Sequence, residues 1–360
     1  MKNMKDGRVY LTLQNGKQFT GYRFGADGDV VGELVFTTGM TGYLETLTDP
    51  SYYGQIVIQT FPLVGNYGIT PDMQSRKPWV SAYVVREKCD NPSNFRCEKT
   101  LEKYLEENGI VGIYGLDTRE LTRIVREAGV MNAAITSKPV KDFSEINRYK
   151  IVGAVKEVTC TEPIYSGNPD GMRIAVWDFG AKYNIARELV KRGCYCMQVP
   201  SFYTAEQILA LNPQGLMLSN GPGDPEDNAE VIANMKKLIG KLPIFGICLG
   251  HQLLALAMGG KTKKMKYGHR GANQPVKCLN TGRVYISSQN HGYEVISSSV
   301  QGVGNVSYVN ANDGTCEGVD YPDYNAFTVQ FHPEARGGPR DASFLFDRFI
   351  KNITEGKYNA

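Results

Sequence analysis

One cysteine bracketed by two glycines is the residue best suited to nucleophilic chemistry. Cys248 follows the apolar stretch Leu242–Ile247 and precedes an apolar run from Leu249 to Met258, which places it at a turn from strand into helix. Such a Gly-x-Cys-x-Gly turn is the cysteine version of a nucleophile elbow. Gly246 and Gly250 allow a tight turn and close approach of a substrate, and the helix N-terminus favours the thiolate. The alternative is a buried cysteine acting as a small hydrophobic residue.

A histidine and a glutamate near the C-terminus could complete a catalytic group with this cysteine. The apolar stretch 326–331 predicts a strand that leads into His332-Pro333-Glu334. Pro333 keeps His332 extended, and residues i and i+2 of an extended segment point the same way, so Glu334 can reach the imidazole. A carboxylate there fixes the tautomer of the base and stabilises its charged form. Without the elbow, an ordinary turn with a solvated glutamate would be the preferred interpretation.

The chain has four histidines, and the other three have weaker claims to catalysis. His251 is the rival base, but on a helix three residues beyond the cysteine it should point away from the site, which favours packing or capping. His291 lies in a polar loop, residues 289–293, that could bind a small ligand. His269 lies between two glycines, in a structural turn or a partner contact.

The loop 219–225 follows a predicted strand and precedes a predicted helix. Its glycines, Gly221 and Gly223, could offer N–H groups to an anion or an oxyanion. Gly-Pro-Gly is weak evidence by itself and gains weight from lying at the same sheet edge as the elbow. A second candidate, Gly260-Lys261-Thr262, resembles the end of a phosphate-binding loop. We exclude it because position 255, where that motif has glycine, is alanine, and because a helix and not a strand precedes it. If ATP is involved, another chain binds it.

The elements that must position these residues fall into two domains. Residues 1–150 open with strand-like segments, followed by two helices, and predict a β-rich α/β domain; the segments are Arg8–Leu13, Gln18–Phe24, Gly32–Thr38 and Gln55–Thr60. Residues 151–171 lose periodicity and are expected to be a linker. From 172 to 360, strands alternate with helices, which predicts a mostly parallel sheet flanked by helices. Ligands bind such sheets at the carboxyl ends of the strands, where Cys248 falls.

Composition excludes several classes of protein. The formal charge of +3 on 360 residues is small and spread out, so we expect no nucleic-acid partner. The sequence has neither an apolar targeting segment at its start nor a run of membrane-spanning length, which makes the expected location cytoplasmic and not the membrane. Eight scattered cysteines without a Cys-x-x-Cys pair argue against a disulfide framework, and no metal site is expected. Cys194 and Cys196, on one face of a strand, are expected to be structural.

Together, the elbow, the His-Pro-Glu segment and the Gly-Pro-Gly loop resemble a class I glutamine amidotransferase domain. Further segments resemble the small subunit of carbamoyl-phosphate synthetase across almost the whole chain; they are 38–43, 47–52, 117–123, 264–273 and 289–293. The resemblance implies a glutaminase subunit of a heterodimer, whose ammonia passes through a tunnel to a large subunit. That partner makes carbamoyl phosphate from bicarbonate and ATP, with magnesium, for arginine and pyrimidine biosynthesis. No cofactor is expected on this chain.

The same resemblance implies roles for individual residues. Cys248 would attack the glutamine carboxamide and form a γ-glutamyl thioester, with His332 as base and acid and Glu334 as its orienter. The N–H groups of Gly223 and Leu249 would form the oxyanion hole. The positions that match glutamine-holding residues are Ser51, Gly221, Gln252, Asn290, Gly292 and Tyr293. Ser51 comes from the first domain, which implies a site at the domain interface.

A few positions depart from the family pattern. Gln274 stands where many relatives have histidine, Arg336-Gly337 replaces Ser-Pro, and Tyr293 stands where phenylalanine is also common. None of these changes a triad member. Two other functions stay open at this point. The chain could feed ammonia to a different synthase, against which the first-half segments argue, or it could be an inactive scaffolding subunit, against which the retained cysteine argues.

Overall fold

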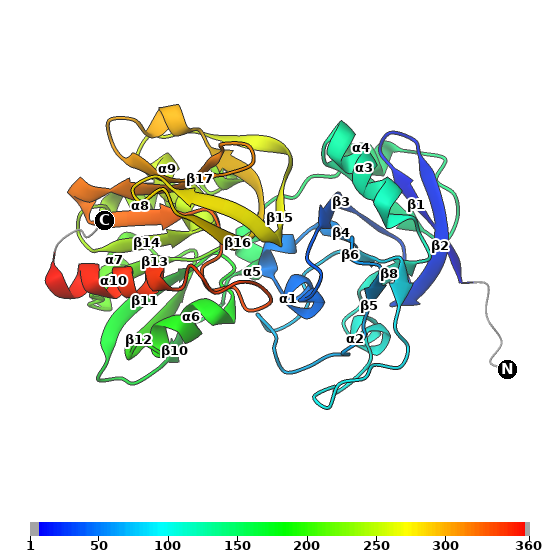
Figure 1. The fold of residues 1–360 in the computed structure, drawn as a ribbon, viewed down its shortest axis with the longest axis horizontal. Coiled ribbons are helices and arrows are strands. Elements are labelled where there is room, and N and C mark those ends of the chain that lie inside the picture. The colour runs from blue at the N-terminus through cyan, green and yellow to red at the C-terminus, as the bar shows by residue number, and fades with distance from the viewer. Residues whose placement is uncertain (1–6, 357–360) are drawn as a thin grey trace. The chain divides into compact units, whose positions relative to one another are not determined.

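The computed structural model describes residues 7–356, and its elements form two compact units, Met1–Ile151 and Val152–Ala360. Figure 1 shows both units as mixtures of strands and helices. Each unit is described by itself below. Within residues 7–356, no helix combines the length and the apolar character needed to cross a bilayer.

The first unit is built on a closed barrel in the order β1-β2-β8-β6-β4-β3-β9. Its strands are β1 (Arg8–Leu13), β2 (Gln18–Gly25), β3 (Val30–Thr37), β4 (Gln55–Gln59), β6 (Ala82–Val84), β8 (Val111–Tyr114) and β9 (Met131–Thr136). The other elements are α1 (Tyr43–Leu47), the 3-10 turn η1 (Pro50–Tyr52), β5 (Leu63–Val64), β7 (Glu87–Lys88), α2 (Leu101–Glu107), α3 (Thr118–Ala128) and α4 (Ser144–Arg148). The β-rich character predicted for this half is confirmed.

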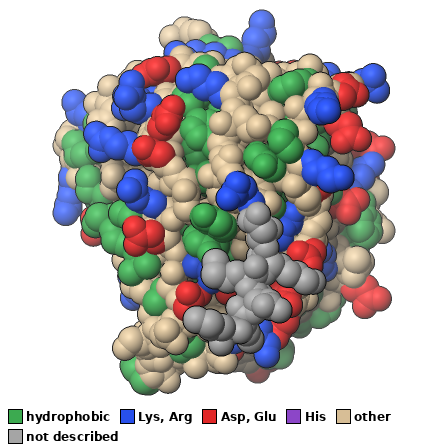
Figure 2. Space-filling view, turned by 90° about the vertical axis from the view of Figure 1, so that its right-hand side faces the viewer, with side chains coloured by type: hydrophobic (Ala, Val, Ile, Leu, Met, Phe, Trp, Pro, Cys, Tyr) green, Lys and Arg blue, Asp and Glu red, His purple; other side chains and the backbone are tan. Residues whose placement is uncertain are grey.

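Side-chain alternation explains the two apolar clusters of the barrel unit. Along β3, Leu34 and Phe36 enter one cluster and Val35 the other, because successive strand residues face opposite sides. Asp117 is the N-cap of α3, since its Oδ1 accepts hydrogen bonds from the N–H groups of Arg119 and Glu120, both at 3.0 Å. Figure 2 shows a face on which acidic and basic side chains are interspersed, in agreement with the small net charge.

The second unit contains one ten-stranded sheet in the order β10-β12-β11-β13-β14-β19-β18-β17-β15-β16. Its strands are β10 (Ile164–Ser166), β11 (Met172–Asp178), β12 (Cys194–Pro200), β13 (Gly215–Leu218), β14 (Ile244–Ile247), β15 (Thr262–Cys278), β16 (Val284–Val295), β17 (Asn305–Asn310), β18 (Cys316–Tyr321) and β19 (Ala326–Val329). The run from β12 to β19 in this order is parallel, as the alternation of strands and helices predicted. The antiparallel continuation through β18, β17, β15 and β16 was not predicted.

Helices cover both faces of the parallel strands. They are α5 (Ala154–Val158), α6 (Tyr183–Val190), α7 (Ala205–Ala210), α8 (Ala229–Leu238), α9 (Leu249–Ala257) and α10 (Phe344–Glu355). Residues of α7, α8 and α9 share one core cluster, whereas residues of α6 and α10 share the other. Strand β11 serves both, with Trp177 facing the first cluster and Val176 the second. Cys194 and Cys196 are buried in the second cluster, which agrees with a structural role.

The segment 151–171 needs a correction, because it is not a free linker. It contains α5 and the edge strand β10, which pairs antiparallel with β12. The Thr159 hydroxyl donates to the Asp178 carbonyl at 2.6 Å, and the Cys160 N–H donates to the Asp178 carboxylate at 2.8 Å. This short strand was not predicted because clustered Pro and Gly residues interrupt the hydrophobic periodicity of the segment. The segment therefore belongs to the second unit.

Candidate active site at the carboxyl edge of the parallel strands

Cys248 lies between β14 and α9 in a strained backbone conformation. Its φ of 54° and ψ of −103° lie in a region that residues with a side chain rarely adopt. Its N–H donates to the Val329 carbonyl of β19 at 2.8 Å, and its carbonyl accepts from the Gln252 N–H at 3.2 Å. The predicted nucleophile elbow is present, with the cysteine as N-cap of the helix.

The two glycines of the elbow serve packing, and the strain sits on the cysteine itself. A Cβ on Gly250 would lie 2.6 Å from both the Cβ and the carbonyl oxygen of Leu218 in β13. A Cβ on Gly246 would lie 2.9 Å from a methyl group of Thr328 in β19. Neither glycine has a positive φ. The glycines therefore let the elbow turn tightly against its neighbouring strands, whereas the positive φ belongs to Cys248 itself.

His332 and Glu334 form the hydrogen-bonded pair that their spacing predicted. Both are buried, and Nδ1 of His332 lies 2.8 Å from Oε1 of Glu334. The imidazole thus donates through Nδ1, which leaves Nε2 as its free nitrogen; within residues 7–356, Nε2 makes no hydrogen bond. This arrangement is that of a base held in one tautomer by a carboxylate.

Lys182 is a site residue that the sequence reasoning missed. It lies in the loop after β11, and its Nζ is 2.7 Å from Oε1 of Glu334. Burial alone would raise the pKa of the Glu334 carboxyl, but the Lys182 charge and then the His332 interaction outweigh it and lower that pKa to about 2. The amide of Asn184, in α6, donates to the Glu334 carbonyl. The signal was available, since Lys182 follows a strand at the same sheet edge as the elbow.

The thiol of Cys248 experiences two opposing influences. The N-terminus of α9 favours the thiolate. The Asn290 carbonyl in β16, however, lies 3.6 Å from Sγ and accepts an S–H···O hydrogen bond, which stabilises the protonated thiol. The contact with Asn290 is therefore one that the protonated thiol makes and the thiolate does not.

The Gly-Pro-Gly loop lies beside the elbow, as expected. Gly250 donates its N–H to the Ser219 carbonyl at 3.0 Å, which joins the start of α9 to the end of β13. A Cβ on Gly221 would meet the Phe179 carbonyl oxygen at 2.2 Å, so this position requires glycine. Gly223 has a φ of +88°, a left-handed conformation that glycine adopts without strain.

Among the positions matched to glutamine binding, the structure brings several to the neighbourhood of the elbow. Gln252, one turn into α9, donates through Nε2 to the Tyr293 carbonyl at 2.8 Å and to Oε1 of Gln330 at 2.9 Å. Asn290, Gly292 and Tyr293 lie on β16, and Leu249 is the first residue of α9. Ser51 belongs to the first unit, in η1, where its N–H donates to Asp49 at 2.9 Å.

The other histidines do not join this site. His251 is buried, its Nδ1 lies 2.7 Å from the Thr328 hydroxyl, and burial lowers its pKa to about 3, so it is a neutral core residue. His269 and His291 are register partners of β15 and β16, and their rings meet edge to face with centroids 5.0 Å apart. The prediction that His291 lies in a loop was wrong: the residue lies within the long strand β16.

The second unit has an α/β fold with a buried cysteine, histidine and glutamate at the carboxyl edge of its parallel strands, and comparisons with known proteins identify its class. Residues 175–352 match the family model described as glutamine amidotransferase class-I, and residues 11–135 match the model of the carbamoyl-phosphate synthase small chain, CPSase domain.

Proteins with curated names give the same result over nearly the full length. Carbamoyl phosphate synthase small chains from Clostridium perfringens and Fusobacterium nucleatum are 50% and 51% identical, covering 96% and 95% of this chain and 99% and 97% of the relatives. The protein of that name from Bacillus caldolyticus is 49% identical and covers 96% of both chains. The chain belongs to the carbamoyl-phosphate synthase small chain family, and its second unit is a class I glutamine amidotransferase.

Proposed function

We propose that this chain hydrolyses L-glutamine to glutamate and ammonia through a γ-glutamyl thioester on Cys248. The observation that carries the proposal is a strained cysteine at a strand-to-helix elbow, in the same sheet edge as an imidazole held by a buried, ionised carboxylate. Family membership supports glutamine as the substrate.

The residues would act in a fixed order. His332 takes the Cys248 proton through Nε2, and the sulfur attacks the carboxamide carbon of glutamine. The N–H groups of Gly223 and Leu249 stabilise the resulting oxyanion. The intermediate collapses as His332 returns the proton to the leaving ammonia. A water molecule, deprotonated by His332, then cleaves the thioester, and glutamate leaves with the thiol restored.

Glu334 would keep His332 in the correct tautomer and stabilise its charged form. Lys182, through its ion pair, keeps Glu334 ionised. We assign glutamine binding to Gly221, Gln252, Asn290, Gly292 and Tyr293, and to Ser51 on the resemblance alone.

The ammonia is proposed to pass through a tunnel to a large carbamoyl-phosphate synthetase subunit. That subunit would hold ATP, magnesium and bicarbonate and would make carbamoyl phosphate for arginine and pyrimidine biosynthesis, so that this chain needs no cofactor of its own. The names of the relatives, which are small chains, support such a partner.

Glutamate release by the purified chain tests the nucleophile. We expect Cys248→Ser to lower the rate by roughly three orders of magnitude or more, because the nucleophile carries most of the acceleration. Cys89→Ser, the same change at a half-buried cysteine of the first unit, is the matched control and should leave the rate unchanged. Equal rates in the Cys248→Ser variant and the parent would overturn the assignment.

Co-purification tests the partner. We expect recovery of a large ATP-using synthetase and glutamine-dependent formation of carbamoyl phosphate by the pair. Recovery of a chorismate- or nucleotide-using synthase in its place would show that the ammonia serves another reaction. A glutamine-analogue affinity label should modify Cys248 in the complex, and failure to do so would indicate an inactive subunit.

A further inference from the structure

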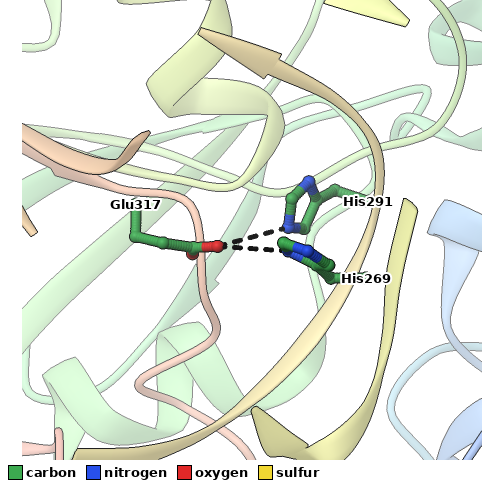
Figure 3. A group of neighbouring side chains, drawn as sticks. All are labelled: His269, His291 and Glu317. Atoms are coloured by element: carbon green, nitrogen blue, oxygen red, sulfur yellow. Dashed lines mark hydrogen bonds and ion pairs between the residues drawn. The ribbon is translucent and has the colours of Figure 1, made fainter. Parts of the chain in front are cut away.

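A second cluster of buried polar side chains lies on the antiparallel part of the sheet. Oε1 of Glu317, in β18, is 3.3 Å from Nδ1 of His269 in β15 and 3.8 Å from Nε2 of His291 in β16. One ligand atom of each residue lies within 4.8 Å of those of the other two. Figure 3 shows both imidazole rings directed at the same carboxylate oxygen. The proposed glutaminase reaction gives this cluster no role.

Hydrogen bonds on the far side of each ring fix which nitrogen faces Glu317. Nε2 of His269 lies 2.8 Å from Oδ2 of Asp313, so it donates its proton to that carboxylate. Nδ1 of His291 lies 2.8 Å from the Tyr293 carbonyl, which can only accept, and its Nε2 lies 3.1 Å from the side-chain amide of Gln289. In the neutral rings, the nitrogens that face Glu317 therefore carry lone pairs. A metal ion there would replace the contact of His291 with Gln289 and that of His269 Nδ1 with the Asn310 amide at 3.4 Å. A carboxylate or carbonyl behind a histidine is the usual support of a metal-binding imidazole.

We propose that His269, His291 and Glu317 bind a divalent transition-metal ion, with Zn²⁺ as the best match. Zinc binds imidazole nitrogen and carboxylate oxygen at about 2.0–2.2 Å, which in a tetrahedron places neighbouring ligand atoms about 3.3–3.5 Å apart. Two of the three separations here are 3.3 and 3.8 Å, so little contraction is needed. Oε2 of Glu317 makes no hydrogen bond within residues 7–356 and is available as a further ligand atom for the metal.

A proton is the competing occupant of this cluster. Burial lowers the pKa of His269, but Glu317 and Asp313 outweigh it and leave that pKa above its ordinary value, so a proton can bridge His269 and Glu317. Burial, the His269 charge and the nearby Arg270 and His332 charges hold the pKa of His291 well below its ordinary value, which keeps it in the neutral form that metals bind. Since the metal must displace the proton from His269, its affinity should rise with pH.

The bound ion would tie three strands together beside the catalytic cysteine. His291 directly follows Asn290, whose carbonyl accepts the Cys248 thiol proton at 3.6 Å. The metal would thus fix the backbone of β16 at that point. The role that we propose for the metal is structural. Its effect on catalysis, through the position of the Asn290 carbonyl next to Cys248, rests on the proposed function.

Zinc binding to the purified, chelator-treated full chain tests the proposal without any assay of glutamine turnover. Isothermal titration with ZnCl₂ should show one equivalent per chain, in both the wild type and Cys248→Ser, because the cluster does not use that thiol. Glu317→Gln, which keeps the shape but removes the carboxylate, should weaken binding at least about 100-fold. The matched control is Glu294→Gln, a buried carboxylate on β16 that pairs with Lys263 and should keep full affinity.

A second variant at a more exposed position is needed because a substitution at the buried Glu317 can disturb folding. The Asp313 side chain is 43% exposed, and Asp313→Asn removes the negative charge behind His269 while it keeps an oxygen for the two hydrogen bonds from Thr315. It should weaken zinc binding by about 10- to 100-fold. Zinc should also raise the unfolding midpoint of the wild type and not that of Glu317→Gln. Failure of the wild type to bind zinc, or equal affinity in Glu317→Gln and the wild type, would overturn the proposal and leave the proposed glutaminase untouched.

Discussion

At the scale of single residues, Lys182 is the group on which the charge state of the site depends. A buried carboxylate without a cation would be protonated over a wide pH range, because burial disfavours the charged form. The ion pair of 2.7 Å reverses this and leaves Glu334 ionised far below neutral pH. An ionised Glu334 in turn stabilises the charge that His332 gains when it takes up a proton.

Lys182→Met should lower the free energy of unfolding by about 3 kcal/mol at pH 7, because it leaves a buried charge without its partner. The folded-state pKa of Glu334 is about 2, below its ordinary value of 4.5, so its contribution is complete above pH 4.5 and is lost as the pH falls toward 2. The difference between variant and parent should therefore shrink over that range. Urea unfolding at a series of pH values measures it.

The control for this prediction is a lysine on the surface. Lys237→Met removes an exposed pair with Glu206 and should change stability by less than about 1 kcal/mol. A Lys182→Met variant as stable as this control would contradict the assigned role.

At the scale of elements, the elbow concentrates backbone strain at one position. The end of β14 and the start of α9 are fixed by hydrogen bonds to Val329 and Ser219 on the strands at either side. The conformation of Cys248 is therefore imposed by its surroundings, at a cost on the order of 1–3 kcal/mol. Such strain fixes the direction of the Cys248 side chain.

Two substitutions at the same position reveal the strain. Cys248→Gly should be more stable than Cys248→Ala by about 1 kcal/mol, because glycine tolerates a positive φ and alanine does not. The same pair at Cys194, buried in the regular strand β12, should show the opposite order. Thermal unfolding of the four variants gives both differences. Alanine as the more stable residue at both positions would show that the elbow is unstrained.

At the scale of the whole molecule, each unit contains its own apolar clusters. The barrel unit has two and the amidotransferase unit has two, with no residue of one unit in a cluster of the other among the described residues. Each unit therefore has the buried apolar surface that independent folding requires.

Residues 152–360 should fold when expressed alone, and residues 172–360 should be markedly less stable. The shorter fragment lacks β10, the buried Val155 of α5 and the hydrogen bonds from Thr159 and Cys160 to Asp178. Urea unfolding followed by circular dichroism compares the two. Equal midpoints would mean that the segment 152–171 is a linker after all.

The sequence predicted the parallel strands and the pairing of His332 with Glu334 because these depend on local patterns. Strand-helix alternation and an i, i+2 spacing are both visible in one stretch of chain. Lys182 was missed because its ion pair with Glu334 joins two loops that are far apart in the sequence. The His269–His291–Glu317 cluster was missed because its members lie on strands that only the folded sheet brings together. The long strands β15 and β16 were missed since bulges interrupt their alternation. The oxyanion hole, the partner and the cytoplasmic location stay predictions.

The surroundings of the Cys248 sulfur also affect how readily it can be oxidised. Oxidation and alkylation of cysteine both proceed through the thiolate and need access to the sulfur. In the described conformation the residue is 2% exposed and its Sγ lies 3.6 Å from the Asn290 carbonyl oxygen. Burial of the sulfur therefore limits its reaction with oxidants and alkylating reagents in this conformation.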